Sequence, residues 1–197
     1  MSIPQFLDAD RPRRQDRDGG EHPAYAAASP MDRQVGEHLR MIHDSYRGGF
    51  AQVQQLVDGI VAGVGDMSAV ADVRAAVHQM GLSAAYQQLG SFCGQLCRAV
   101  EAHHRIEDAH LYPALRAADS SGEHGLAPVL DRLAAEHLVV HEALETFDEI
   151  ARGAQTDPSR LGELAEAYAA LRALVESHFA YEEQQIGLPL AVHGVRI

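Results

Sequence analysis

The sequence predicts an all-α protein, an up-down-up-down four-helix bundle with a short extra helix between the first and second long helices. Apolar side chains recur at helical spacing over long stretches, most clearly over residues 161–186. The hydrophobic content is 46%, and much of it is Ala and Leu, which favour helix. Short or modest connectors separate the long stretches, as expected for neighbouring helices that run in opposite directions.

The helical elements follow from the apolar period and from the positions of Gly and Pro. The four long helices are expected over about residues 31–61, 82–117, 126–152 and 158–186, and the short one over about residues 69–80. Ser29-Pro30 is a plausible start for the first helix. Pro113 should kink or end the second helix, and Gly187-Leu188-Pro189 should end the fourth.

Charge and hydropathy exclude several classes of function. The formal net charge is −12 with an isoelectric point near 5.3, and no basic stripe is visible, which argues against nucleic-acid binding. No apolar run approaches the roughly 20 residues that a membrane-spanning helix needs. Arg13-Arg14 resembles part of an export signal, but the polar stretch 15–20 follows where an apolar segment is required. Neither nucleic acid nor membrane is therefore expected as a partner.

The two cysteines, Cys93 and Cys97, lie one helical turn apart within a single expected helix. Such a pair is more often small core filler than a disulfide. A chain with free thiols fits a reducing compartment. We therefore expect a cytoplasmic protein.

The twelve histidines are the first sign of metal or proton chemistry. Helical periodicity places seven polar side chains on core-facing stripes, namely His43, His103, Glu107, His137, His141, His178 and Glu182. Periodicity favours His103 and Glu107 over the neighbouring pair His104 and Asp108, which lies about 100° further round the helix. His110 also falls on the inward face, one turn beyond Glu107.

Buried polar groups without partners are costly, and a metal would satisfy all seven side chains. If both carboxylates bridge two ions and an oxide or hydroxide also bridges them, one coordination position stays open for dioxygen, peroxide, nitric oxide or azide. Histidine with carboxylate and no thiolate suits iron or manganese, and zinc less well in this setting. Iron is the first choice because an iron pair can exchange electrons with a small ligand.

Four stretches, taken in order, resemble the hemerythrin-like, HHE cation-binding family of the bacterial type. They are His-Asp at 43–44, His-His-Arg-Ile-Glu-Asp with Leu-Tyr-Pro over 103–113, Glu-His with His over 136–141, and His-Phe-Ala-Tyr-Glu-Glu with Leu-Pro over 178–189. The resemblance implies a four-helix bundle with two iron ions, oxo- or hydroxo-bridged, for which Glu107 and Glu182 are the bridging ligands. From the resemblance we also expect the residue at the position of His141 to vary among bacterial members of the family.

One departure separates this sequence from the invertebrate oxygen carriers of that family. Their last motif places histidine and aspartate five residues apart, whereas His178 and Glu182 are four apart, as in many bacterial relatives. The expected domains are a disordered segment over residues 1–29, the bundle over 30–190 and a tail over 191–197. Tyr46, His110 and Tyr181 are the candidates for contact with the ligands or with a bound oxygen molecule.

The expected function is therefore a non-haem di-iron protein that binds a small oxidant. It either binds or senses dioxygen or nitric oxide reversibly, or turns over peroxide as a di-iron oxidoreductase. The alternative is a non-redox metal-binding or iron-responsive interaction module. A ferritin-like site would need a second Glu-x-x-His pair, and the place corresponding to Glu107 and His110 reads Glu182 and Gln185. The sequence assigns no catalytic residue and no oligomeric state.

Overall fold

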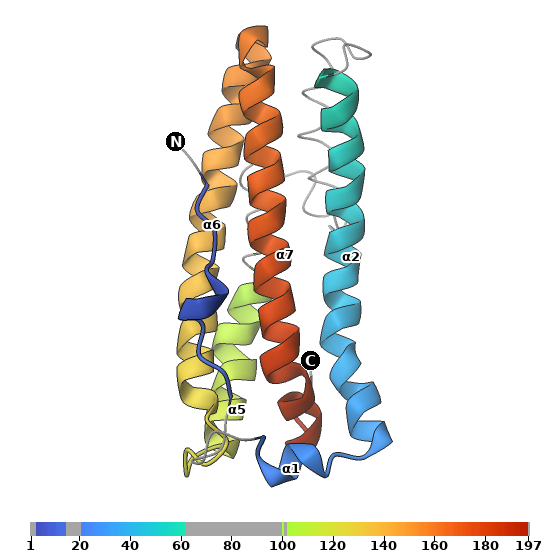
Figure 1. The fold of residues 1–197 in the computed structure, drawn as a ribbon, viewed down its shortest axis with the longest axis vertical. Coiled ribbons are helices and arrows are strands. Elements are labelled where there is room, and N and C mark those ends of the chain that lie inside the picture. Colours follow the sequence, from blue (N-terminus) through green and yellow to red (C-terminus); the bar gives the residue numbers. More distant parts are fainter. Residues whose placement is uncertain (1–2, 15–20, 62–99, 101, 197) are drawn as a thin grey trace. The chain divides into compact units, whose positions relative to one another are not determined.

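The computed structural model describes residues 3–14, 21–61, 100 and 102–196, and the regular elements in these ranges are helical (Figure 1). The prediction of an all-α helical fold is confirmed. The short helix expected over 69–80 and both cysteines lie outside the described residues. In the part of the chain that the structure describes, no helix is long and apolar enough to cross a membrane.

The described elements are short helices near the N-terminus followed by longer ones. In chain order they are η1 (Asp8–Asp10), α1 (Pro23–Ala26), α2 (Pro30–Val61), η2 (Glu107–Leu111), α5 (Tyr112–Ala118), α6 (Leu126–Thr156), η3 (Pro158–Arg160) and α7 (Leu161–Val192). Residues 102–106 are also helical and lead directly into η2. The start of α2 is fixed by a capping box, in which the Ser29 and Asp32 side chains each accept a hydrogen bond from the other's amide.

The chain divides into two compact units. The first comprises Met1–Gln5, Asp44–Ala102 and Val139–Glu176, and the second comprises Phe6–His43, His103–Leu138 and Ser177–Ile197. Helices α2, α6 and α7 contribute residues to both units. The first unit has a core in which the ring of Tyr168 lies 5.5 Å from that of Phe147, and the Tyr168 hydroxyl donates to the carbonyl of Phe50 at 2.6 Å.

The second unit has its own apolar core, built from α2, η2 with α5, α6 and α7. Its buried members are Leu39, Leu111, Tyr112, Leu115, Leu126, Val129, Leu130, Leu133, Tyr181, Ile186 and Leu190. Apolar residues recur every three or four positions along each of these segments, so each presents one face to the shared core. The members of the polar cluster described below belong to this unit.

Helix α7 does not end at Gly187-Leu188-Pro189 as the sequence predicts, but continues to Val192. Gly187 is used for close packing, because a Cβ built there would lie 3.0 Å from the carbonyl oxygen of Gly36 in α2. Gly194, two residues beyond the end of the helix, has a φ of 65°, which glycine readily adopts. The amide of Val195 donates to the carbonyl of Leu190 at 2.8 Å, as in a Schellman motif.

The turn η2 is a π-helical turn, in which the amide of Tyr112 donates to the carbonyl of Glu107, five residues back. Pro113 follows in the first turn of α5, so the helix does not end there. A proline ring clashes with the carbonyl four residues before it in a regular helix, and a wide turn relieves that clash. The wide turn also changes which residues face the core downstream of it.

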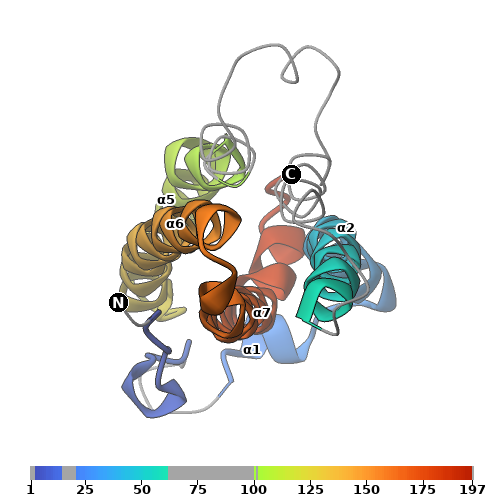
Figure 2. The ribbon, with the colours of Figure 1, turned by 90° about the horizontal axis from the view of Figure 1, so that it is seen from above.

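Residues 6–14 lie beside α6 and α7 in both views of the ribbon (Figure 1, Figure 2). The Tyr181 hydroxyl donates to the carbonyl of Pro12 at 2.6 Å, and the amide of Arg14 donates to the Gln185 side chain at 2.9 Å. Arg11 is buried among these contacts. The N-terminal domain boundary stays a prediction, but this part of the segment makes specific contacts with the second unit.

Candidate metal centre

Polar side chains from four helical segments meet inside the second unit. His43 comes from α2, His137 from α6, and His178 and Glu182 from α7. The helical stretch that enters η2 supplies His103, His104 and Glu107. These residues form two groups of potential metal ligands, and within each group the ligand atoms lie within 4.8 Å of one another.

The first group consists of His43, His103, Glu107 and Glu182. Nε2 of His43 lies 3.2 Å from Nε2 of His103 and 3.4 Å from Oε2 of Glu182. Nε2 of His103 lies 3.1 Å from Oε1 of Glu107. The ring of Phe179 stacks on that of His43 at 4.0 Å and covers one side of the imidazole.

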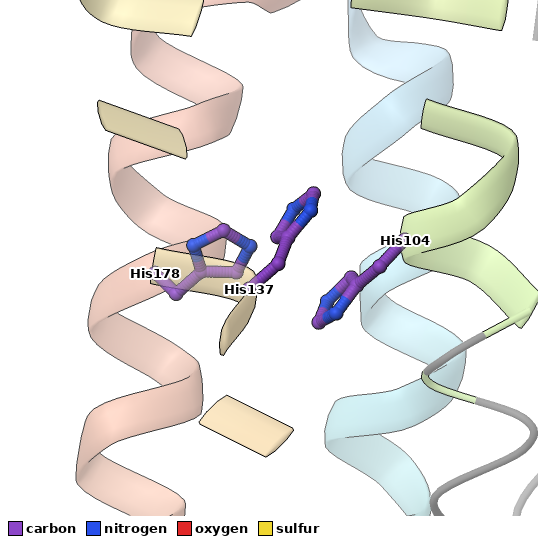
Figure 3. A group of neighbouring side chains, drawn as sticks. All are labelled: His104, His137 and His178. Carbon is purple, nitrogen blue, oxygen red and sulfur yellow. The ribbon is translucent and has the colours of Figure 1, made fainter. Parts of the chain in front are cut away.

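The second group consists of His104, His137 and His178. Figure 3 shows the three imidazoles in the space between their helices, with His137 between the other two. The His104 and His137 rings are stacked 3.8 Å apart, and the rings of His137 and His178 meet edge to face at 5.0 Å. All three side chains are buried.

The two carboxylates connect these groups. Oxygens of Glu107 lie 3.1 Å from His103 of the first group and 3.6 Å from His137 of the second. Oε2 of Glu182 lies 3.4 Å from Nε2 of His43 and 3.9 Å from Nε2 of His178. Each carboxylate is therefore close to imidazoles of both groups, as a ligand that bridges two ions must be.

Several of these buried atoms have no hydrogen-bond partner within the described part of the chain. They are both oxygens of Glu107, Oε2 of Glu182, and Nε2 of His104 and of His178. Buried polar atoms are nearly always satisfied, and each exception requires an explanation. Bound cations would satisfy these atoms, so the residues present fit a metal site.

Three of the imidazoles have a second carboxylate at their other ring nitrogen. Nδ1 of His43 lies 2.9 Å from Glu183, Nδ1 of His137 lies 3.2 Å from Asp108, and Nδ1 of His178 lies 3.2 Å from Glu136. A carboxylate in this position accepts the Nδ1 hydrogen, fixes the ring and leaves Nε2 free to bind a metal. Each of these outer acids is adjacent in sequence to a ligand residue on its own helix.

Burial controls the charge of the site. It lowers the pKa of His103 to about 4, and it lowers the pKa of His104 well below its usual value and that of His178 as well. Burial, together with the charge of Glu182, raises the pKa of Glu107. Burial also opposes ionisation of Glu182, but the surrounding imidazoles outweigh it and lower its pKa. Neutral imidazoles are the form that binds metal.

Tyr112 is a third kind of polar group in the cluster. Its hydroxyl donates to Oε1 of Glu182 at 2.7 Å and lies 3.2 Å from Nε2 of His137. Burial and the charge of Glu182 raise its pKa well above the usual value, so the phenol keeps its proton. The wide turn η2 brings Tyr112 to this position. In a regular helix Tyr112 would point away from His103, at about 100° per residue.

The structure brings together six of the seven side chains that the sequence predicts as ligands. The exception, His141, is 40% exposed, and its Nε2 lies 3.3 Å from Oε1 of Glu145. His104, which periodicity places near the edge of the stripe, is instead buried in the second group. A bundle helix contacts two neighbours, so its buried face is wide enough to include residues about 100° apart. The ligand assignment as a whole stays a prediction.

The structure gives each of the three candidates for contact with the ligands a different setting. His110 is exposed, because the wide turn η2 removes it from the face that a regular helix would present. Tyr46 is half-buried and belongs to the first unit. Tyr181 is buried, but its hydroxyl holds the N-terminal segment through Pro12. The hydroxyl of a different tyrosine, Tyr112, lies in the cluster.

The fold and the cluster together define a helical protein with a histidine–carboxylate site able to hold metal ions. The family model of the hemerythrin HHE cation-binding domain matches residues 66–187, more than half of the chain. The chain therefore belongs to the hemerythrin HHE family, which confirms the resemblance seen in the sequence. The matched range contains every member of the two groups except His43. Comparisons with curated proteins and with solved structures gave no match.

Proposed function

We propose that this chain is a non-haem di-iron protein that binds a small oxidant, such as dioxygen, peroxide or nitric oxide, at one open position of the iron pair. The arrangement of the two buried carboxylates carries this proposal. Glu107 lies between His103 and His137, and Glu182 lies between His43 and His178. Carboxylates and imidazoles in this arrangement suit iron, while manganese and zinc share part of the same donor preference.

Bound iron would supply exchangeable electrons and a Lewis-acidic position for the small molecule. The protein's own residues define the surroundings of that position. The outer acids Asp108, Glu136 and Glu183 hold three imidazoles in place. The phenol of Tyr112 holds one oxygen of Glu182 and keeps a proton inside a buried site.

Metal content and colour test the proposal. Protein purified aerobically without chelator should contain about two iron ions per chain, as in other di-iron bundles. It should absorb in the near ultraviolet, and azide should change that spectrum. Glu107→Gln and Glu182→Gln should lose most of the iron, whereas His110→Ala, outside both groups, should keep it. Negligible iron, even after anaerobic loading with ferrous ion, would overturn the proposal and favour an interaction module.

Peroxide turnover is a second candidate, and Tyr112 is the observation that favours it. A catalyst that decomposes or reduces peroxide needs a group that can hold or move a proton, and the Tyr112 hydroxyl lies within the cluster. Oxygen evolution after mixing the iron-loaded protein with peroxide would identify a di-iron oxidoreductase. Iron-loaded protein that responds to azide but evolves no oxygen and consumes no peroxide would be a binder or sensor.

A further inference from the structure

Arg11 connects the N-terminal segment to the metal-centre residues. Its guanidinium donates from Nε to Oε1 of Glu136 and from Nη2 to Oε2 of Glu136, both at 2.8 Å. Nη1 donates to Ser177 at 2.9 Å. The Arg11 side chain is only 4% exposed, and its guanidinium carbon lies 4.6 Å from the centre of the Tyr181 ring. Such a two-bond contact fixes the position of both partners.

Glu136 also contacts a predicted metal ligand, His178. Its Oε2 also lies 3.2 Å from Nδ1 of His178, and its Oε1 accepts from Nε of Arg132 at 2.8 Å. Its side chain is 1% exposed, compared with 18% for Glu183 and 45% for Asp108, the outer acids at His43 and His137. A carboxylate this deeply buried needs a paired cation to remain in place.

We infer that Arg11 is a positioning residue for His178. By fixing both oxygens of Glu136, it keeps Oε2 aimed at Nδ1 of His178 as the acceptor of the ring hydrogen. The tautomer with hydrogen on Nδ1 leaves the lone pair of Nε2 facing the cluster, where that nitrogen has no hydrogen-bond partner in the described structure. Residues 6–14 are in this way a functional part of the metal centre. This inference rests on the proposed metal site.

Arg11→Gln in the full-length chain tests the inference, with Arg13→Gln as a matched control. Arg13 lies in the same segment but is 39% exposed and bonds to Asp8 and Gln184, away from the cluster. The first readout needs no metal. Nitrogen–proton correlation NMR of the imidazoles in metal-free protein reports which ring nitrogen of His178 carries the hydrogen. We expect Nδ1 in the unmodified chain and in Arg13→Gln, and a mixture of both tautomers in Arg11→Gln.

The second readout is the loss of bound iron, or of zinc as a colourless substitute, to an excess of chelator. Removal of an outer-shell partner typically weakens metal binding by about 10–100-fold, and we expect a faster release of this order in Arg11→Gln alone. An Arg11→Gln protein with the original tautomer and release rate would overturn the inference. If the unmodified chain binds no metal, the proposed function fails, while the tautomer still decides whether Arg11 positions His178.

Arg11→Lys covers the possibility that Arg11→Gln does not fold. Lysine keeps the positive charge but cannot form the two parallel bonds to Glu136. With unchanged helix content by circular dichroism, Arg11→Lys should show a smaller change in tautomer and release rate in the same direction. If Arg11→Lys folds and behaves as the unmodified protein in both readouts, the positive charge alone suffices, and the inferred positioning by the guanidinium is wrong.

Discussion

The hydroxyl of Tyr112 donates a 2.7 Å hydrogen bond to Oε1 of Glu182, a carboxylate that lies between imidazoles of both histidine groups. Both side chains are buried, so this bond satisfies an oxygen that water does not reach. This hydrogen bond connects α5 to α7. It also places a proton donor next to a predicted bridging ligand, which makes Tyr112 a sensitive position for both stability and chemistry.

Tyr112→Phe should lower the free energy of unfolding of the metal-free protein by about 1–3 kcal/mol, because Glu182 loses a buried partner. It should keep its iron and turn over peroxide more slowly. Urea unfolding and oxygen evolution measure the two effects. Tyr168→Phe is the matched control, since it loses a similar buried bond to the carbonyl of Phe50 in the first unit. The control should be destabilised with peroxide chemistry unchanged, and an equal loss of turnover in both variants would contradict a role for Tyr112.

Substitution of His104 and of His141 distinguishes the ligand set that the structure suggests from the set predicted from the sequence. His104→Ala should lose most of the bound metal, because Nε2 of His104 is buried, unpartnered in the described structure and close to His137. His141→Ala should retain it, because that side chain is 40% exposed and its Nε2 lies 3.3 Å from Glu145. Metal per chain after desalting gives the answer. Loss in His141→Ala with retention in His104→Ala would restore the ligand set predicted from helical periodicity.

Gly36→Ala should lower the free energy of unfolding by about 1–3 kcal/mol, as overpacking usually does. An added Cβ would lie 3.0 Å from the carbonyl oxygen of Gly187, and backbone cannot move aside as a flexible side chain can. Gly48→Ala is the control, because a Cβ there has no neighbour within 4 Å. That variant should be stabilised by about 0.5–1 kcal/mol through helix propensity. Equal effects in both variants, measured by urea unfolding, would show that the stability of the protein does not depend on the close packing of Gly36 in α2 against Gly187 in α7.

Acidification should release α1 from the C-terminal end of α7. Nε2 of His193 lies 3.0 Å from the Tyr25 hydroxyl, and the ring of His124 lies 3.9 Å from that of His22 and 5.0 Å from that of His193. Burial lowers the pKa of His193, as do His124 and His22, while Asp119 opposes the shift.

The folded pKa of His193 is therefore below the usual histidine value of 6.5. Its contribution to docking is complete above pH 6.5 and is lost as the pH falls towards the folded pKa. Amide hydrogen exchange at Tyr25 and Ala26 should accelerate over that range, after correction for the intrinsic pH dependence of exchange. His193→Gln should remove much of this change. Exchange with the same pH dependence in that variant would show that His193 is not the group responsible.

Helical periodicity predicted the all-α fold and six of the seven histidines and carboxylates that meet inside the second unit. Those residues repeat on core-facing stripes, so their positions follow from a regular helix. His104 was misjudged because periodicity treats a helix as having one buried face, whereas this stretch contacts more than one neighbour. His110 was misjudged because η2 is wider than a regular turn. A local change in helical winding has no clear signal in a single sequence.

The positions of the outer acids in the sequence contain a signal from which their role could have been predicted. Asp108, Glu136 and Glu183 each stand next to a predicted ligand, but each serves an imidazole on another helix. Only the tertiary arrangement shows which pairs form. Arg11 had no signal, since it lies in a stretch whose composition resembles a disordered tail. Its role depends on contacts with Glu136, which is 125 residues away in the chain.

The wide turn at Glu107–Leu111 accommodates one residue more than a regular helix would use over the same rise. The orientation of the core residues after the turn, relative to the ligands before it, therefore depends on the number of residues in the turn and not only on which residues they are. If this turn became a regular one with all its residues kept, Tyr112 would rotate by about 100° away from Glu182, whereas deletion of the exposed Ala109 would give a regular turn that leaves Tyr112 in place. Chain length at an exposed position, where substitutions are usually harmless, is thus part of what shapes the interior of this protein.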